Sequence, residues 1–186
     1  AFRHRPDQLA QPGERMIVAG LQCGEGGGQP GHVRRQIAAG QPFQRLLHRR
    51  DRTVAIDLLA GPSEVAVISD ETADPVLVAA DLLGQAEHGP NSPAALITTS
   101  EEHGHAVIAE IERQLETLAT VDIAGAAWRD YGVVTVVKDR ETAVALMDDL
   151  APEHLELLTS DDDWYHENLR NYGSIFIGPW STVAYS

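Results

Sequence analysis

The chain has 186 residues and a net charge of −14, so it is long enough to bury a hydrophobic core and too acidic overall to favour a phosphate-rich partner. A single cysteine, Cys23, excludes an internal disulfide framework, and no apolar run approaches the roughly 18 residues that a membrane-spanning helix needs. These features predict a soluble, cytoplasmic protein without a membrane partner.

Residues 1–52 differ from the rest of the chain in composition. They hold nine Arg, no Lys and four acidic residues, whereas residues 53–186 carry a net charge of −19. Such a segment has little to bury. It fits a basic arm for nucleic acid, a flexible tail, or a stretch translated out of frame from a GC-rich gene, and we favour the last. The acidic remainder argues against nucleic acid as a partner, because it repels phosphate.

From Thr53 onward, strand patterns and helix patterns alternate. Short apolar runs predict strands, and longer amphipathic or capped stretches predict helices. The expected strands are 54–59, 65–68, 94–100, 133–137, 155–158 and 174–178, and the expected helices are 75–88, 101–119, 140–150 and 162–172. This order predicts an α/β fold of βαβ units, with a mainly parallel sheet covered by helices.

The helix over 75–88 begins with Asp74 as its N-cap and Pro75 at its first position, and it stops before Gly89-Pro90. Gln85 and His88 are three residues apart, so both side chains leave one face of the helix, where a metal could bind. The pair equally fits an ordinary helix end, because a His in the last turn is favoured by the carbonyl groups there.

Glu153 and His154 form a second polar pair, at the lip of the strand over 155–158. A neighbouring carboxylate and imidazole suit acid–base chemistry, and strand lips are where ligands gather in α/β proteins. A solvated pair at a helix end is the alternative. His103 and His105 are expected to be exposed, and the acids of 161–163 to form an N-cap cluster. No G-x-G-x-x-G turn follows Thr53, so a standard dinucleotide loop is not expected.

Four separated segments resemble the histidinol dehydrogenase family in order and spacing: AGPSEV (60–65), ADLLGQAEHGPNS (80–92), LAPEHLEL (150–157) and GSIFIGPW (173–180). The resemblance implies an incomplete Rossmann-like domain, a homodimer, and a zinc- and NAD-dependent enzyme that oxidises L-histidinol to L-histidine through the aldehyde. It also implies residue roles. Gln85 and His88 would be zinc ligands, Ser63, Gln85, His88 and His154 would contact substrate, Glu153 would activate water, and His154 would be the general base.

The chain departs from this family pattern at three places. The Gly-Pro-Gly-Asn cofactor segment is missing before residue 60, where the text reads GGGQPGHVRRQ, so no cofactor-binding residue can be assigned. Two further zinc ligands, an Asp and a His beyond the GPW segment, are also missing, and we expect 53–186 to be a domain truncated at its C-terminus. The ending STVAYS suggests another small polar alcohol, such as a dihydroxypropane sulfonate, as an alternative substrate. An inactive binding or oligomerisation remnant is the third possibility.

Overall fold

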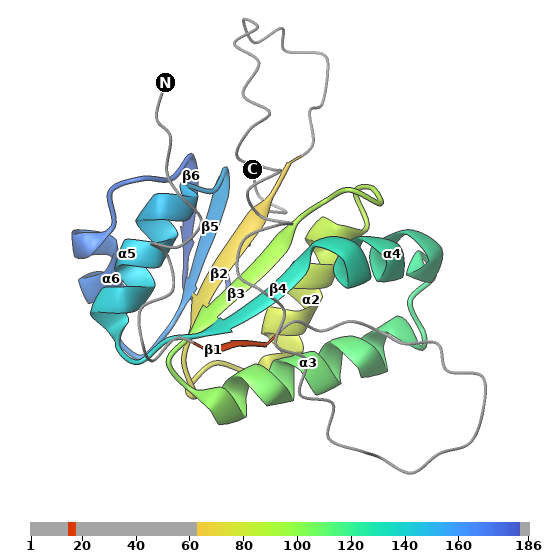
Figure 1. Ribbon diagram of the computed structural model, residues 1–186, viewed down its shortest axis with the longest axis horizontal. Coiled ribbons are helices and arrows are strands. Elements are labelled where there is room, and N and C mark those ends of the chain that lie inside the picture. The colour runs from red at the N-terminus through yellow and green to blue at the C-terminus, as the bar shows by residue number, and fades with distance from the viewer. Residues whose placement is uncertain (1–14, 18–62, 183–186) are drawn as a thin grey trace, which may run out of the picture.

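The computed structural model describes residues 15–17 and 63–182, which form one six-stranded sheet with helices on both faces (Figure 1). The strand order is β1-β4-β3-β2-β5-β6, with β2 to β6 parallel and β1 antiparallel to β4. The strands are β1 (Arg15–Ile17), β2 (Val65–Ser69), β3 (Ala94–Thr98), β4 (Gly132–Val136), β5 (His154–Leu158) and β6 (Ser174–Ile177). The expected α/β class and mainly parallel sheet are therefore confirmed.

Five helices connect the parallel strands. They are α2 (Pro75–Ala86), α3 (Glu101–Leu115), α4 (Val121–Tyr131), α5 (Arg140–Leu150) and α6 (Asp162–Asn168). Asp74 caps α2 as expected, accepting a hydrogen bond from the Val76 amide at 2.9 Å, with Pro75 at the first position. No helix in the described ranges is long and apolar enough to cross a membrane.

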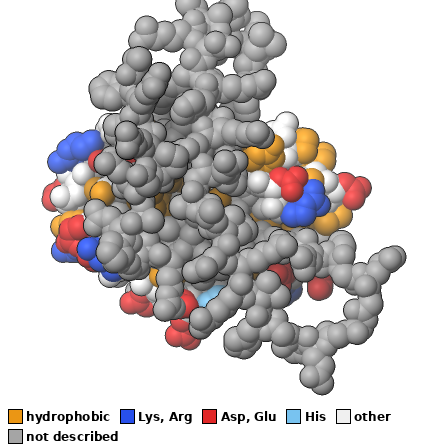
Figure 2. Space-filling view, viewed as in Figure 1, with side chains coloured by type: hydrophobic (Ala, Val, Ile, Leu, Met, Phe, Trp, Pro, Cys, Tyr) orange, Lys and Arg blue, Asp and Glu red, His pale blue; other side chains and the backbone are white. Residues whose placement is uncertain are grey.

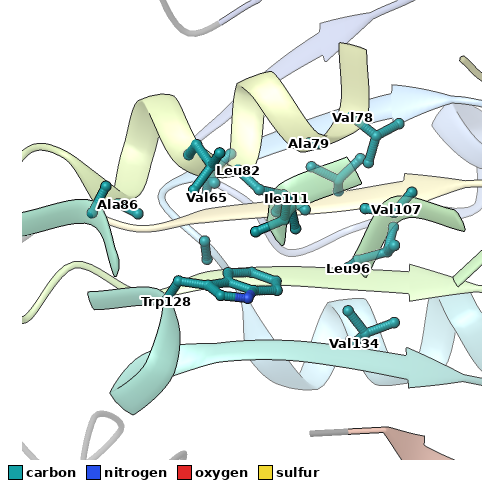
Figure 3. Close-up of a cluster of buried hydrophobic side chains, with 14 of the residues drawn as sticks. Val65, Val78, Ala79, Leu82, Ala86, Leu96, Val107, Ile111, Trp128 and Val134 are labelled. Atoms are coloured by element: carbon teal, nitrogen blue, oxygen red, sulfur yellow. The ribbon is translucent and has the colours of Figure 1, made fainter. Parts of the chain in front are cut away.

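The sheet separates two hydrophobic cores. Helices α2, α3 and α4 cover one face, where Trp128 of α4 packs with Ile111 of α3 and Leu82 of α2 (Figure 3). Helices α5 and α6 cover the other face, where Met147 and Tyr165 pack on the alternate side chains of β2, β3 and β5. Each central strand is buried on both sides, which explains why its sequence reads as a continuous apolar run.

The structure corrects two predicted helices. The stretch expected as one helix over 101–119 ends at Leu115, and a separate α4 follows after a turn. The pattern missed α4 because its buried residues are mostly small, with Ala124 and Ala127 beside Trp128. The helix expected over 162–172 ends at Asn168. The Leu169 amide still bonds to the Tyr165 carbonyl, but the amides of Arg170 and Asn171 donate to Asp148 instead of continuing the helix.

The expectations for residues 1–52, and the strand expected over 54–59, lie outside the described residues except for the backbone of β1. On the face shown in Figure 2, acidic side chains are exposed along the lower margin and at both sides of the described part, and Arg and Lys appear among them at the sides.

Strand register fixes which loops meet. Val65 in β2 lies opposite both Ala94 in β3 and His154 in β5, and His154 lies opposite Ser174 in β6. Because each helix returns the chain to the start of the next strand, the segments that precede the strands gather at the amino edge of the sheet. This edge receives Ser63 and Glu64, the end of α2, the Glu153–His154 pair and Gly173, whereas the GPW part of the fourth segment follows the carboxyl end of β6.

Candidate functional site

Ser63 and Gln85 meet directly at the amino edge, although 22 residues separate them. The Gln85 amide nitrogen donates to the Ser63 carbonyl at 2.6 Å and lies 2.9 Å from the Ser63 hydroxyl. Gln85 is only 3% exposed. Two oxygen partners on one side fix the amide nitrogen there, so Oε1 is the atom that Gln85 can offer to a ligand.

His88 stands one turn beyond Gln85, just past the end of α2. Its amide donates to the Gln85 carbonyl at 3.2 Å, and its ring Nδ1 lies 2.8 Å from the Gly84 carbonyl oxygen. A carbonyl oxygen can only accept, so Nδ1 must carry the proton in this hydrogen bond. The exposed ring then presents Nε2 as an acceptor or metal ligand, which is the usual arrangement for a ligating imidazole.

His154 is the first residue of β5 and is tied to the residue before β2. Its amide and its Nδ1 both lie 3.2 Å from the Glu64 carbonyl oxygen. The ring stands beside Phe176, with 6.2 Å between ring centroids. As with His88, the carbonyl contact places the proton on Nδ1 and leaves Nε2 as the ring nitrogen that can accept a proton.

Glu153 precedes His154 and is exposed. Its backbone carbonyl accepts a hydrogen bond from the Ser174 amide at 2.8 Å, and the chain at Gly173 passes so close that an added Cβ would lie 2.6 Å from this oxygen. Gly173 therefore allows the β6 segment to approach the Glu153–His154 pair. No other residue could take this place without moving the backbone.

Two acidic side chains, buried Glu156 on β5 and half-buried Asp81 on α2, are in contact. Glu156 of β5 is 1% exposed and shares a hydrogen bond with Asp81, which is one turn before Gln85 on α2. Burial raises the pKa of Asp81, against the effect of its hydrogen bonds with Glu156 and Thr182. Two carboxyl groups in contact must share a proton. Sequence reasoning missed this pair, although an acid inside the apolar run LELL was a signal for it.

The opposite, carboxyl edge of the sheet is closed by its own hydrogen bonds. Asp70, directly after β2, accepts bonds from the amides and hydroxyls of Thr72 and Ser160, at 2.5 to 3.0 Å. Burial alone would raise the Asp70 pKa, but these bonds together lower it. Since the chain leaves β2 and β5 in opposite directions, this is the switch point where α/β folds commonly bind ligands.

The structure contradicts the exposure expected for His103 and the reason given for a site at Glu153 and His154. His103 was expected to be exposed, but it is 4% exposed and shares a 2.8 Å hydrogen bond between its Nε2 and the Ser69 hydroxyl, because the first turn of α3 packs under the end of β2. Glu153 and His154 do lie at a strand lip, but it is the amino lip, whereas the general rule concerns carboxyl ends. His105 is exposed as expected, and Asp161 caps α6.

Within residues 63–182, no group of three or more His, Cys, Asp or Glu side chains could hold a metal ion. Gln85 Oε1 and His88 Nε2 suit zinc in donor type, but they are two ligands where catalytic zinc sites use three from protein. These residues therefore fit part of a zinc site. Residues 63–182 do not form the usual dinucleotide loop either, because β2 leads into the Asp70 network rather than into a glycine-rich turn.

Comparisons with known proteins agree with the motif segments. A family model described as histidinol dehydrogenase matches residues 44–186. A histidinol dehydrogenase homolog from Shouchella clausii is 53% identical over 132 residues, which cover 71% of this chain and 31% of the relative. Histidinol dehydrogenase from Rhizobium meliloti is 43% identical over 173 residues, which cover 92% of this chain and 39% of the relative.

Among solved structures, that of histidinol dehydrogenase from Elizabethkingia anophelis superposes with a TM-score of 0.65 at 41% sequence identity. The match covers 70% of this chain and 30% of that one. The chain thus spans about a third of the length of the relatives that it matches.

Proposed function

The chain belongs to the histidinol dehydrogenase family, and we propose that residues 63–182 supply half of the zinc site and the acid–base pair of an enzyme that oxidises L-histidinol to L-histidine through the aldehyde. The observation that carries the proposal is the dipeptide Ser63-Glu64. Ser63 holds Gln85 of the metal pair, and Glu64 holds His154 of the acid–base pair. The metal pair and the acid–base pair, which are 65 or more residues apart in the chain, are thereby both held by the dipeptide Ser63-Glu64.

In the alcohol step, His154 removes the hydroxyl proton. Its Nε2 accepts the proton while Nδ1 stays at the Glu64 carbonyl, and the resulting imidazolium keeps that hydrogen bond. In the aldehyde step, the exposed carboxylate of Glu153 takes a proton from water, so that the hydrate can be oxidised to the acid. The two steps use neighbouring residues on one strand end, which allows the intermediate to remain bound between them.

Gln85 and His88 would hold zinc, together with ligands from outside residues 63–182. When bound, zinc supplies a Lewis acid that polarises the substrate hydroxyl. Ser63 fixes the Gln85 amide and would contact substrate with its hydroxyl. NAD is the proposed hydride acceptor, although residues 63–182 do not form the usual dinucleotide loop. A homodimer and a small polar alcohol as substrate belong to the same proposal.

Two observations favour a second substrate class. The chain continues after GPW as STVAYS, and the relatives from Shouchella clausii and Pelagibacter ubique, at 53% and 49% identity, are named homologs of histidinol dehydrogenase. The same residues could then oxidise another small polar alcohol, such as a dihydroxypropane sulfonate. An inactive binding remnant remains a third candidate.

The division of labour is tested by Glu153→Gln in a full-length enzyme that contains these residues. With zinc, NAD and histidinol, a single turnover should reduce one NAD per site quickly, and the second should slow by roughly 100-fold or more as aldehyde accumulates. The wild-type enzyme should reduce two. Equal slowing of both steps, with zinc retained, would contradict the assignment of Glu153 to water. Oxidation of only a sulfonate diol would select the second substrate class.

A further inference from the structure

The loop between α2 and β3, residues 87–93, is fastened to both ends of α4. The Thr120 hydroxyl, at the start of α4, donates to the Glu87 carboxylate at 2.8 Å. The Tyr131 hydroxyl, at the end of α4, donates to the Asn91 side-chain oxygen at 3.2 Å. His88 lies between these two attachment points, so a separate helix holds the chain on both sides of this residue.

Thr120 stands at an N-cap position, but its side chain makes no capping hydrogen bond. It is the N-cap of α4, where a Thr side chain ordinarily accepts a hydrogen bond from the first turn. Here it makes no such bond, and its hydroxyl reaches instead to a residue 33 positions earlier in the chain. The contact with Glu87 therefore replaces a local capping bond.

The helix that holds the loop is itself firmly placed. Trp128 is 1% exposed and lies in the core with Ala124 and Ala127 (Figure 3). The chain then passes against this ring, since a Cβ on Gly132 would lie 2.4 Å from it. The middle and the C-terminal end of α4 are therefore held in the core, while Val121 and Ile123 in its first turn are exposed. A helix anchored in this way can restrict the loop through the hydrogen bonds that it makes to Glu87 and Asn91.

We propose that Thr120 and Tyr131 are positioning residues for His88. By holding Glu87 and Asn91, they favour the loop arrangement of this structure, in which His88 Nδ1 meets the Gly84 carbonyl and Nε2 faces outward. The use of this imidazole as a zinc ligand rests on the function proposed above. We call the two hydrogen bonds from Thr120 to Glu87 and from Tyr131 to Asn91 the brace. The brace does not depend on the proposed function, because it concerns the loop in the absence of metal.

The brace is tested in the full 186-residue chain, by hydrogen exchange and by ¹⁵N spectra of the imidazoles. The amides of His88 and Ser92 are bonded to Gln85 and Gly89, so their exchange reports opening of the loop. Thr120→Val and Tyr131→Phe should each speed it about threefold to tenfold, and the double variant more. The His88 spectrum should change from a single Nδ1–H tautomer towards a mixture.

Matched controls separate positioning from general loosening. Thr120→Ser keeps the hydroxyl and should restore wild-type exchange and tautomer. Thr117→Val removes a hydroxyl that bonds only to the Gln114 carbonyl nearby, and Tyr172→Phe changes a tyrosine on the other face of the sheet. Both should leave the loop unchanged. Unaltered exchange and an unaltered His88 tautomer in the double variant would overturn the proposal.

Failure of the brace and failure of the proposed function give different results. The second readout is the Kd for Zn²⁺ in a full-length enzyme, without NAD or substrate. A loosened loop with weaker zinc binding in the double variant supports both proposals. A loosened loop in an enzyme that never binds zinc supports the brace and contradicts the function. An unchanged loop in a zinc-binding enzyme contradicts the brace alone.

Discussion

The polar side chains at the two edges of the parallel sheet differ in their hydrogen-bond partners. At the carboxyl edge, Asp70, Thr72 and Ser160 satisfy one another, and His103 is buried against Ser69. At the amino edge, Gln85, His88 and His154 bond to backbone oxygens with one end of each side chain, and the other end is where the proposed ligands would bind. Polar residues and imidazoles occur at both edges, so residue type alone does not identify the site.

The comparison shows what distinguishes a site from a structural network. Carboxyl ends of strands are the usual binding edge of α/β folds, and the switch point between β2 and β5 lies there. In this chain Asp70 occupies the switch point and accepts hydrogen bonds from Thr72, after β2, and from Ser160, after β5. The amino edge can serve instead because α2, β2 and β5 bring the ends of three motif segments together, with backbone carbonyls that orient each side chain.

The largest expected effect is loss of metal at the amino edge. In a full-length enzyme that contains these residues, Gln85→Ala and His88→Ala should each weaken zinc binding by more than about 100-fold, since even groups that only support a ligand are worth 10- to 100-fold. Zinc content after dialysis measures this. Gln114→Ala and His105→Ala, which change an amide and an imidazole on α3, are the controls. Full zinc occupancy in His88→Ala would remove His88 from the site.

At the carboxyl edge, the same kind of change should cost stability instead of function. Asp70→Ala removes the acceptor of four hydrogen bonds and should lower the free energy of unfolding by about 2–4 kcal/mol. Urea denaturation measures the loss. Asp74→Ala, which removes only the exposed cap of α2, should cost about 1 kcal/mol. An Asp70 variant that stays equally stable but loses zinc or activity would reverse the roles of the two edges.

A smaller effect is expected on the pH dependence of stability, through His103. Burial lowers the pKa of His103 below 6.5, although Asp70 and Glu71 oppose the shift. The unfolded chain therefore takes up a proton before the folded chain does, and stability that is complete above pH 6.5 should fall as the pH drops below it. The slope cannot exceed about 1.4 kcal/mol per pH unit for one proton. Urea denaturation of His103→Asn should show a flatter dependence below pH 6.5, and an unchanged slope would exclude His103 as its source.

Local patterns predict much of this fold and less of the site. The capping of α2 by Asp74 and the buried strands follow from short stretches of sequence. By contrast, α4 escapes detection because small residues pack against the core, and His103 is buried because of where α3 crosses the end of β2. Both depend on tertiary contacts that no local window contains.

The pairs Gln85–His88 and Glu153–His154 stand out in the sequence by residue type and spacing, and the family resemblance adds Ser63, but the contacts that these residues make depend on strand register. Gln85 reaches Ser63 across 22 residues, and His154 reaches Glu64 across 90. Spacing along the chain predicts neither contact. It also misses Asp81 with Glu156, because the pairing of one helix with one strand is needed to see that two acids face each other.

The central claim is that the amino edge carries the chemistry, and two imidazoles of the same protein test it most directly. His154→Asn and His103→Asn should be compared in a full-length enzyme by single-turnover oxidation of histidinol and by zinc content. His154→Asn should keep zinc and slow the alcohol step by roughly 100- to 10,000-fold, as expected for loss of a general base, while His103→Asn should lower stability and leave this step nearly unchanged. Full activity in His154→Asn, or a comparable loss in a folded His103→Asn enzyme, would contradict the claim.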